Sequence, residues 1–446
     1  MRSPTAKTDM MEVARQAVAL AKKHGAREAA ATTTRDREVE LRWRDGKLEK
    51  VSEATTRGLS LQLYVEGRYS AASTSDLRPE ALDAFVREAA AMTRRLAADE
   101  HRRLPEPELY AGRSQADLRL EDPAQRELTM EERRRYSQAM EEAARAADKK
   151  GVILSVTASF GDSEGESHRV SSNGFEGSQR ATIFSASAEV SVKDADGRRP
   201  EEYDYAVSHW RADMPAPEEI GRRASERALG RLGSKKAKSA KMTMVVDHRA
   251  AGRLVSMVLD PLTGMAVQQK RSFLDGKLGA KVGSDVFTLS DDPLLERGLG
   301  SRTYDREGIS SHARPIFEAG VLKTYFIDTY YARKLGTAPT TTSVSNLAWK
   351  LGAKTQAALL AEVKDGILVT GFLGGNSNPA TGDFSFGVQG YRIHGGRMAE
   401  PVGEMNIAGN QADLWKRLVL VGNDPFAYSS MRTPTLVFEK VDFAGV

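Results

Sequence analysis

The stretch between residues 151 and 210 constrains the fold more than any other part of the sequence. Three runs in which apolar and polar residues alternate follow one another there: GVILSVTASFGDS, ESHRVSSNGFEGSQRATIFSASAEVSV and RPEEYDYAVSHW. Asn173-Gly174 and Asp196-Gly197 mark the turns, because both dipeptides favour tight hairpins. Alternation with a period of two places every second side chain on one face, so this stretch is predicted to form a long antiparallel β-ribbon.

The rest of the first half combines helices with a second antiparallel segment. Residues 38–77 alternate in short runs, with turns at Asp45-Gly46 and Glu66-Gly67, and are predicted to form a meander of about four strands. Four further stretches carry apolar residues at helical spacing. These predicted helices cover residues 9–24, 78–99, 129–150 and 215–234.

A lysine-rich segment, KKAKSAK at residues 235–241, interrupts the apolar periodicity and marks a predicted domain boundary. Beyond it, short apolar runs separated by glycine, asparagine and aspartate are typical of strands and turns. The predicted fold class is therefore α+β, with an N-terminal α+β domain (residues 1–234) that contains an antiparallel sheet and long helices, and a β-rich C-terminal domain (residues 235–446). Helices in the second domain are predicted at 248–259 and near 328–335, 355–364 and 411–420.

Composition excludes several kinds of site. The 446 residues include no cysteine, which excludes disulfides, thiolate nucleophiles and cysteine-containing zinc sites in this chain. No two of the seven histidines lie within six residues of each other, so a local histidine pair for a metal is excluded. The net charge of +4 is small for this length, and the basic runs lack interleaved aromatic residues apart from Tyr136, so nucleic acid is not an expected partner. The absence of a long apolar run and of a secretory segment predicts a cytoplasmic protein without a membrane partner.

Some further features leave two interpretations open. The acidic pairs Asp291-Asp292 and Asp305/Glu307 suit a cation or acid–base work, but they also suit turns in which aspartate caps the backbone. The glycine-rich GFLGGNSNPATGD lacks the spacings of a phosphate-binding loop. A free edge of the ribbon at residues 165–210 could pair with an extended peptide, unless the fold covers it.

Several stretches together resemble the TldD/TldE (PmbA) family. They are SSNGFEG, DPLTGMAVQQKRSFLDGKLG, YDREGI, GVLKTYFIDTYYARKLG, ATGDFSFGVQGY, PVGEMNIAGN and VGNDP. The resemblance covers nearly the whole chain. The family has two branches that form a heterodimer: TldD-type chains are zinc peptidases whose helix carries H-E-x-x-x-H, and TldE/PmbA-type chains lack that motif.

The corresponding positions of this sequence read H-R-A-A-G-R. His248 stands at the first histidine, Arg249 at the glutamate and Arg253 at the second histidine. A hydrolytic zinc site needs neutral imidazole or carboxylate ligands and a carboxylate that accepts a proton from water. Arg249 stays protonated and Arg253 has no lone pair for a metal, and two cations repel Zn²⁺. The resemblance also implies a cysteine ligand from the C-terminal domain, which this chain lacks. We therefore predict neither a catalytic residue nor a metal site here.

The resemblance implies a TldE/PmbA-type subunit without a cofactor of its own. It would pair with a TldD-type subunit that holds the zinc, and help to enclose a chamber for unfolded or short peptides; alone, it could form a homodimer. His248 could contact a peptide, and the two arginines could bind a carboxylate or form internal salt bridges. Two other functions remain open: an independent metallopeptidase that uses His312 or His394 with acidic residues, and a homo-oligomeric protein that binds peptides or modulates gyrase.

Overall fold

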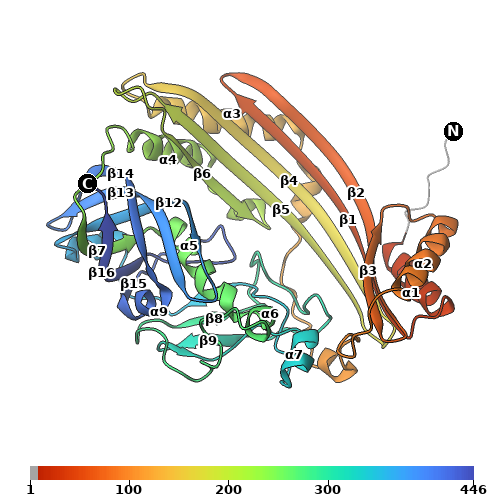
Figure 1. Cartoon of the computed structure of the whole chain (residues 1–446). Helices are drawn as coiled ribbons and strands as arrows, with labels where there is room; N and C mark the ends of the chain where they lie inside the picture. Colours follow the sequence, from red (N-terminus) through yellow and green to blue (C-terminus); the bar gives the residue numbers. More distant parts are fainter. Residues whose placement is uncertain (1–8) are drawn as a thin grey trace.

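The structure, a computed structural model, describes residues 9–446. Residues 1–8 lie outside the described residues. They are part of the predicted N-terminal domain and of the N-terminal segment that is not expected to be a secretory signal. A six-stranded antiparallel sheet forms the frame of the first half and arches over the C-terminal strands (Figure 1). Its strand order is β3-β2-β1-β4-β5-β6. The strands are β1 (Glu28–Arg44), β2 (Lys47–Val65), β3 (Arg68–Thr74), β4 (Ile153–Ser171), β5 (Glu176–Val192) and β6 (Glu201–Ser208).

The predicted ribbon is present as β4, β5 and β6, with Gly174 and Gly197 at positive φ in its turns. The meander before it contains three strands rather than about four, because β1 and β2 are long and unbroken. Strand β1 also begins at Glu28, where the small residues AAATTT give no clear alternation of polarity. Antiparallel pairing of β1 with β4 joins the meander and the ribbon into one sheet.

Four helices cover one face of this sheet. They are α1 (Met10–Lys23), α2 (Pro79–Thr93), α3 (Met130–Ala146) and α4 (Pro217–Leu229). Ala158 and Phe160 of β4, with Ala186 of β5, are buried together with residues of α3 and α4. The alternate residues of the same strands point to the opposite face, which we call the inner face, since successive side chains of a strand point to opposite sides.

The second half is built around a six-stranded sheet with the order β14-β13-β12-β7-β16-β15. An additional pairing between β14 and β16 closes most of it into a small barrel, and β12 and β7 are its parallel pair. A four-stranded sheet, β10-β9-β8-β11, lies beside it (Figure 1). The strands are β7 (Ala240–Val246), β8 (Leu289–Asp291), β9 (Arg314–Glu318), β10 (Val321–Leu322), β11 (Leu347–Trp349), β12 (Asp365–Ser377), β13 (Asp383–His394), β14 (Arg397–Asn410), β15 (Leu418–Val421) and β16 (Leu436–Ala444).

The helices of this half are α5 (His248–Leu259), α6 (Gly264–Gln268), α7 (Thr329–Leu335), α8 (Gln356–Glu362) and α9 (Gln411–Leu414). Three of the four predicted helices are therefore present at α5, α7 and α8. The fourth, predicted at 411–420, is wrong beyond Arg417, because Leu418–Val421 pairs with β16 as a strand. Leu418 is fully buried in the barrel core with Trp415, so tertiary packing overrides the helical spacing there.

Candidate functional site

Helix α5 starts directly after strand β7 and carries the predicted motif positions. Asp247 caps the helix, since its Oδ1 accepts a hydrogen bond of 2.9 Å from the Arg249 backbone nitrogen. Leu254 and Val258 bury the opposite side of the helix in the barrel core. The start of α5 and its first two turns are thereby held in a fixed orientation toward the edge of the large sheet.

Arg249 crosses from this helix to strand β6 of the first half. Its guanidinium forms a salt bridge and hydrogen bond with Asp204, and the side chains are only 9% and 2% exposed. Nη2 also donates to the carbonyl oxygen of Tyr203 at 3.2 Å. Burial lowers the pKa of Arg249, and the nearby Tyr203 and Glu202 oppose that shift. An arginine in such a pair stays charged, so this position holds a fixed cation.

Asp204 is shared with helix α4. Arg223 donates to it at 2.8 Å, and Arg227 lies 4.0 Å away. Several guanidinium groups therefore surround one buried carboxylate, which ties α5 to both β6 and α4. Removal of one member of a buried ion pair is costly because it leaves the other charge unpaired.

His248 has a different set of partners. Its Nδ1 lies 3.0 Å from Oδ2 of Asp424, and its ring stacks on Phe426 with centroids 5.7 Å apart. Asp424 also accepts hydrogen bonds from the backbone nitrogen and hydroxyl of Thr435 at 3.0 and 2.7 Å. Burial would raise the pKa of Asp424, but the bonds from His248 and Thr435 outweigh it and lower the pKa. The Asp424 carboxylate therefore acts as a hydrogen-bond acceptor. The contacts with Asp424 and Phe426 fix the position of the His248 ring.

Arg253 lies one turn further along α5 and is exposed. Its guanidinium carbon is 5.1 Å from the centroid of Phe386, at a distance suited to a cation–π contact. Within residues 9–446 it has no salt-bridge partner. The three motif positions thus lie on one helix, but they point to three different environments.

These residues do not fit a zinc ion. Asp204 and Asp424 are engaged by arginine and histidine, Asp247 caps the helix, and Arg249 places a fixed positive charge beside β6. Across the described part of the chain, no group of three His, Asp or Glu side chains could hold a metal ion. Of the relocated ligands predicted as an alternative, His394 lies on the surface with Asp365 and Glu400 at 3.6 and 3.5 Å, and His312 is exposed.

One member of each acidic pair, Asp292 and Asp305, has the turn role that was one of the two interpretations. The other members accept hydrogen bonds from distant segments, Asp291 from Ser345 and Glu307 from Thr329. Oδ1 of Asp305 accepts from the backbone nitrogens of Glu307 and Ile309 at 2.9 and 3.0 Å, and Asp292 accepts from Leu294 at 3.0 Å. The free edge of the ribbon is partly covered. The carbonyl oxygen of Tyr203 accepts from Arg249, and that of Glu201 accepts from Arg231 at 3.2 Å.

Sequence reasoning missed Asp204 and Asp424 as partners of the motif positions. A signal existed for Asp204, because it occupies a helix-facing position of the alternating segment EEYDYAVS, where a lone acid needs a buried cation. Asp424 belongs to VGNDP, where an aspartate is equally compatible with an ordinary turn. Nothing in that pentapeptide distinguishes the two roles.

A hollow of about 420 Å³ lies on the inner face of the large sheet. Small residues of β4 and β5 form its floor, and side chains of β1 and β6 form its sides. A second hollow of about 340 Å³ shares Arg42, Ser159 and Ser187 with it, so the two form one depression that we call the inner trough. Tyr205 belongs to the trough and packs against Phe426 with ring centroids 5.4 Å apart. One end of the inner trough therefore reaches the start of α5.

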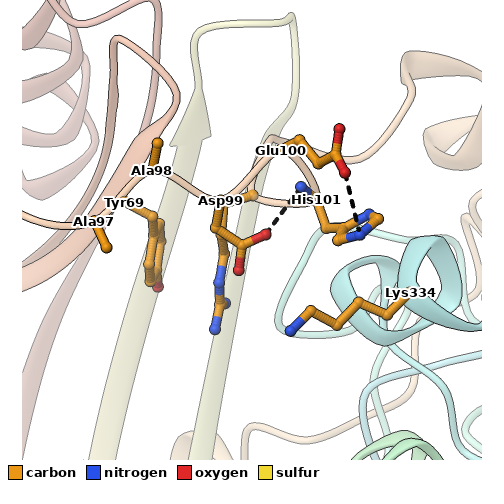
Figure 2. Close-up of a pocket in the computed structure, with 8 residues that line it drawn as sticks. Tyr69, Ala97, Ala98, Asp99, Glu100, His101 and Lys334 are labelled. Atoms are coloured by element: carbon orange, nitrogen blue, oxygen red, sulfur yellow. Dashed lines mark hydrogen bonds and ion pairs between the residues drawn. The ribbon is translucent and has the colours of Figure 1, made fainter.

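A larger surface hollow of about 810 Å³ lies between residues 97–102 and helix α7. Figure 2 shows Asp99 and Lys334 among the residues that line it. The Arg102 guanidinium lies 3.4 Å from the centroid of Tyr330, whose hydroxyl donates to Asp99 at 2.8 Å. These contacts join the two halves of the chain.

The three domains described for PmbA/TldA metallopeptidases match residues 33–93 (domain 1), 123–232 (central domain) and 239–445 (C-terminal domain). The chain belongs to the PmbA/TldD family. Within this family, the Metalloprotease PmbA of Escherichia coli O157:H7 is 29% identical over 430 residues, which cover 96% of this chain and 94% of that protein.

Solved structures of PmbA/TldD proteins have the same fold. A proposed modulator of DNA gyrase from Bacteroides thetaiotaomicron VPI-5482 is 42% identical, with a TM-score of 0.95 over 99% of this chain and 100% of that one. TldE from Thermococcus kodakarensis is 21% identical, with a TM-score of 0.85 over 97% of this chain and 100% of that one. In the present chain, no helix of the described part is long and apolar enough to cross a membrane.

Proposed function

We propose that this chain is a non-catalytic, TldE/PmbA-like subunit of a zinc metallopeptidase complex. It pairs in the cytoplasm with a TldD-type subunit that supplies the zinc site, and the complex degrades or processes unfolded or short peptides. The observation that carries the proposal is the buried salt bridge between Arg249 and Asp204. It fills the position of the family's catalytic glutamate with a cation that the fold itself requires.

The chemistry at this position supports a structural role. A general base needs a lone pair that accepts a proton near neutral pH, and a guanidinium offers none. His248 keeps an imidazole at the first motif position, but Asp424 and Phe426 hold it as part of the fold. The remaining motif position, Arg253, is exposed and is suited to contact with an anion rather than with a cation.

Zinc content and partner binding test the proposal. The chain purified alone should contain near-zero zinc per chain by elemental analysis, and should not hydrolyse an unfolded protein substrate. Addition of the TldD-type subunit from the same organism should give a stable complex on gel filtration, with hydrolysis that a chelator abolishes.

Each alternative has its own outcome. One tightly held zinc per chain, with chelator-sensitive cleavage by the chain alone, would replace the proposal with an independent peptidase. Stable self-association without any response to a TldD-type subunit would favour the homo-oligomeric peptide-binding or gyrase-modulating protein instead.

A further inference from the structure

The inner trough is acidic, although the whole chain carries a net charge of +4. Glu38, Glu189 and Glu201 line it, and all three are exposed. Within residues 9–446 none of the three forms a salt bridge. Unpaired carboxylates gathered in one concave surface create a local negative potential, which attracts cationic ligands.

The cations at this surface are already neutralised. Arg42 lies 3.2 Å from Glu40, and Lys50 lies 2.8 Å from the other oxygen of the same carboxylate. Arg44 pairs with Glu49 at 3.4 Å. Apart from buried Asp162, which pairs with Arg133, five carboxylates and two arginines line the trough, with Lys50 beside them, and the excess is negative.

Strand register gives the inner trough its shape. Ser159 of β4 lies opposite Ser187 of β5, and Gly161 lies opposite Ser185, so the floor consists of small side chains. A Cβ at Gly161 would lie 3.1 Å from the Ser185 hydroxyl oxygen, a distance that leaves little room for a larger residue. On the β1 side, Arg42 stands beside Ser159.

The opposite side of the trough is aromatic. Tyr205 of β6 lies opposite Ser187, and Tyr203 lies opposite Glu189. The two rings stack with centroids 5.9 Å apart, and Tyr203 is 53% exposed. The Arg249 guanidinium already lies over both rings, with its central carbon 5.6 and 5.4 Å from the centroids of Tyr203 and Tyr205. The rings therefore give the trough an apolar side next to Glu189, and the carboxylates attract a cationic side chain.

We propose that the inner trough binds an extended, basic polypeptide segment. The small hydroxyl-bearing floor lets a peptide backbone approach and offers hydrogen-bond partners to it, whereas the carboxylates select lysine and arginine side chains. This inference deepens the proposed function, because it names the charge class of the peptide that this subunit receives. The inference rests on the proposed function in one respect, namely that the peptide is a substrate of the peptidase complex.

A binding assay with the full chain alone tests the proposal. Three fluorescently labelled glycine-serine peptides of equal length are compared by anisotropy, one with lysines, one with glutamates and one without charges. The lysine peptide should bind at least about tenfold more tightly than the other two, and high salt should weaken its binding strongly, since exposed charges are screened within about 8 Å at physiological ionic strength.

A triple variant, Glu38→Gln with Glu189→Gln and Glu201→Gln, should bind the lysine peptide about tenfold more weakly than the unchanged chain, since it removes three exposed charges that attract the lysines. The matched control is Glu88→Gln with Glu142→Gln and Glu439→Gln, which removes three exposed carboxylates outside the trough. Circular dichroism checks that both variants fold.

Equal binding of all three peptides, no binding of the lysine peptide, or equal losses in both variants would overturn the proposal. Since the assay needs neither zinc nor a partner, its failure is distinct from a failure of the proposed function. Conversely, if lysine peptides bind selectively but no TldD-type subunit associates with the chain, the trough proposal would be supported and the proposed function would be contradicted.

Discussion

At the scale of single residues, Arg249 of α5 has a structural role. The charge of its side chain is complementary to that of buried Asp204 on strand β6. The guanidinium is surrounded by favourable contacts: the salt bridge, a hydrogen bond to the Tyr203 carbonyl oxygen, and the nearby rings of Tyr203 and Tyr205. Arg249→Glu would place two carboxylates side by side in a buried position.

Asp204→Asn should therefore be among the most destabilising single changes in the chain. It leaves Arg249 and Arg223 without their buried carboxylate, and we expect the free energy of unfolding to fall by about 3–5 kcal/mol. Arg249→Ala should cost less, about 1–3 kcal/mol, because Arg223 still pairs with Asp204. Urea denaturation followed by circular dichroism measures both. Exposed Arg253→Ala is the control and should change stability by no more than about 0.5 kcal/mol; an equal loss there would contradict the role given to Asp204.

Glu307 leads to a pH prediction at the same scale. Burial raises the pKa of this carboxyl to about 7, against hydrogen bonds from the Thr329 backbone and hydroxyl that lower it. The folded state then binds a proton more tightly than the unfolded state. Stability is unaffected below the unfolded pKa near 4.5, decreases as pH rises from there to about 7, and stays reduced above it.

Urea titrations at pH 5.5 and pH 8 should therefore differ for the unchanged chain, with lower stability at pH 8. Glu307→Gln cannot ionise, so it should remove about 2 kcal/mol of that difference, since one pKa unit corresponds to about 1.4 kcal/mol. A variant whose stability depends on pH as strongly as the unchanged chain would contradict the assignment to Glu307.

At the scale of elements, helices α3 and α4 approach closely where α4 carries a glycine. A Cβ at Gly221 would overlap the carbonyl oxygen of Met140, so the two helices touch through backbone atoms. Gly221→Ala should force them apart and lower the free energy of unfolding by about 1–3 kcal/mol, as overpacking does. Gly252→Ala in α5 is the matched control, because its new Cβ would meet nothing closer than 3.6 Å, and alanine should stabilise that helix by about 0.5–1 kcal/mol. Similar effects of both changes in denaturation would refute the close contact.

The helices and strands also show which features of the fold can be predicted from the sequence and which cannot. Period-two alternation predicted the ribbon, and helical spacing predicted α5, because these signals are local. The β1–β4 pairing joins residues far apart in the chain, and no local pattern encodes it. The motif positions were found through the family resemblance, yet their partners Asp204 and Asp424 come from other strands and loops. Leu418, predicted in a helix, is a strand residue because its partner Phe438 lies in a distant strand.

At the scale of the whole molecule, salt bridges and hydrogen bonds tie the two halves of the chain together at separate places. One tie is the Arg249–Asp204 salt bridge beside β6. Another is Arg333 of α7, which donates to the carbonyl oxygens of Arg103 and Leu104 at 2.8 and 2.7 Å. Because the inner trough ends at Tyr205, beside Arg249, the first tie also sets where the trough meets α5.

These ties should make the two halves unfold together. Scanning calorimetry of the unchanged chain should show a single transition, since strong interdomain contacts couple the unfolding of each half. Asp204→Asn with Arg333→Ala removes a partner from both ties, and should split the transition in two as the halves lose their coupling. The control, Arg253→Ala with Arg397→Ala, changes two exposed arginines and should keep the single transition. Two transitions in the unchanged chain would mean that these contacts do not couple the halves, whereas a single transition in the double variant would place the coupling in the rest of the interface.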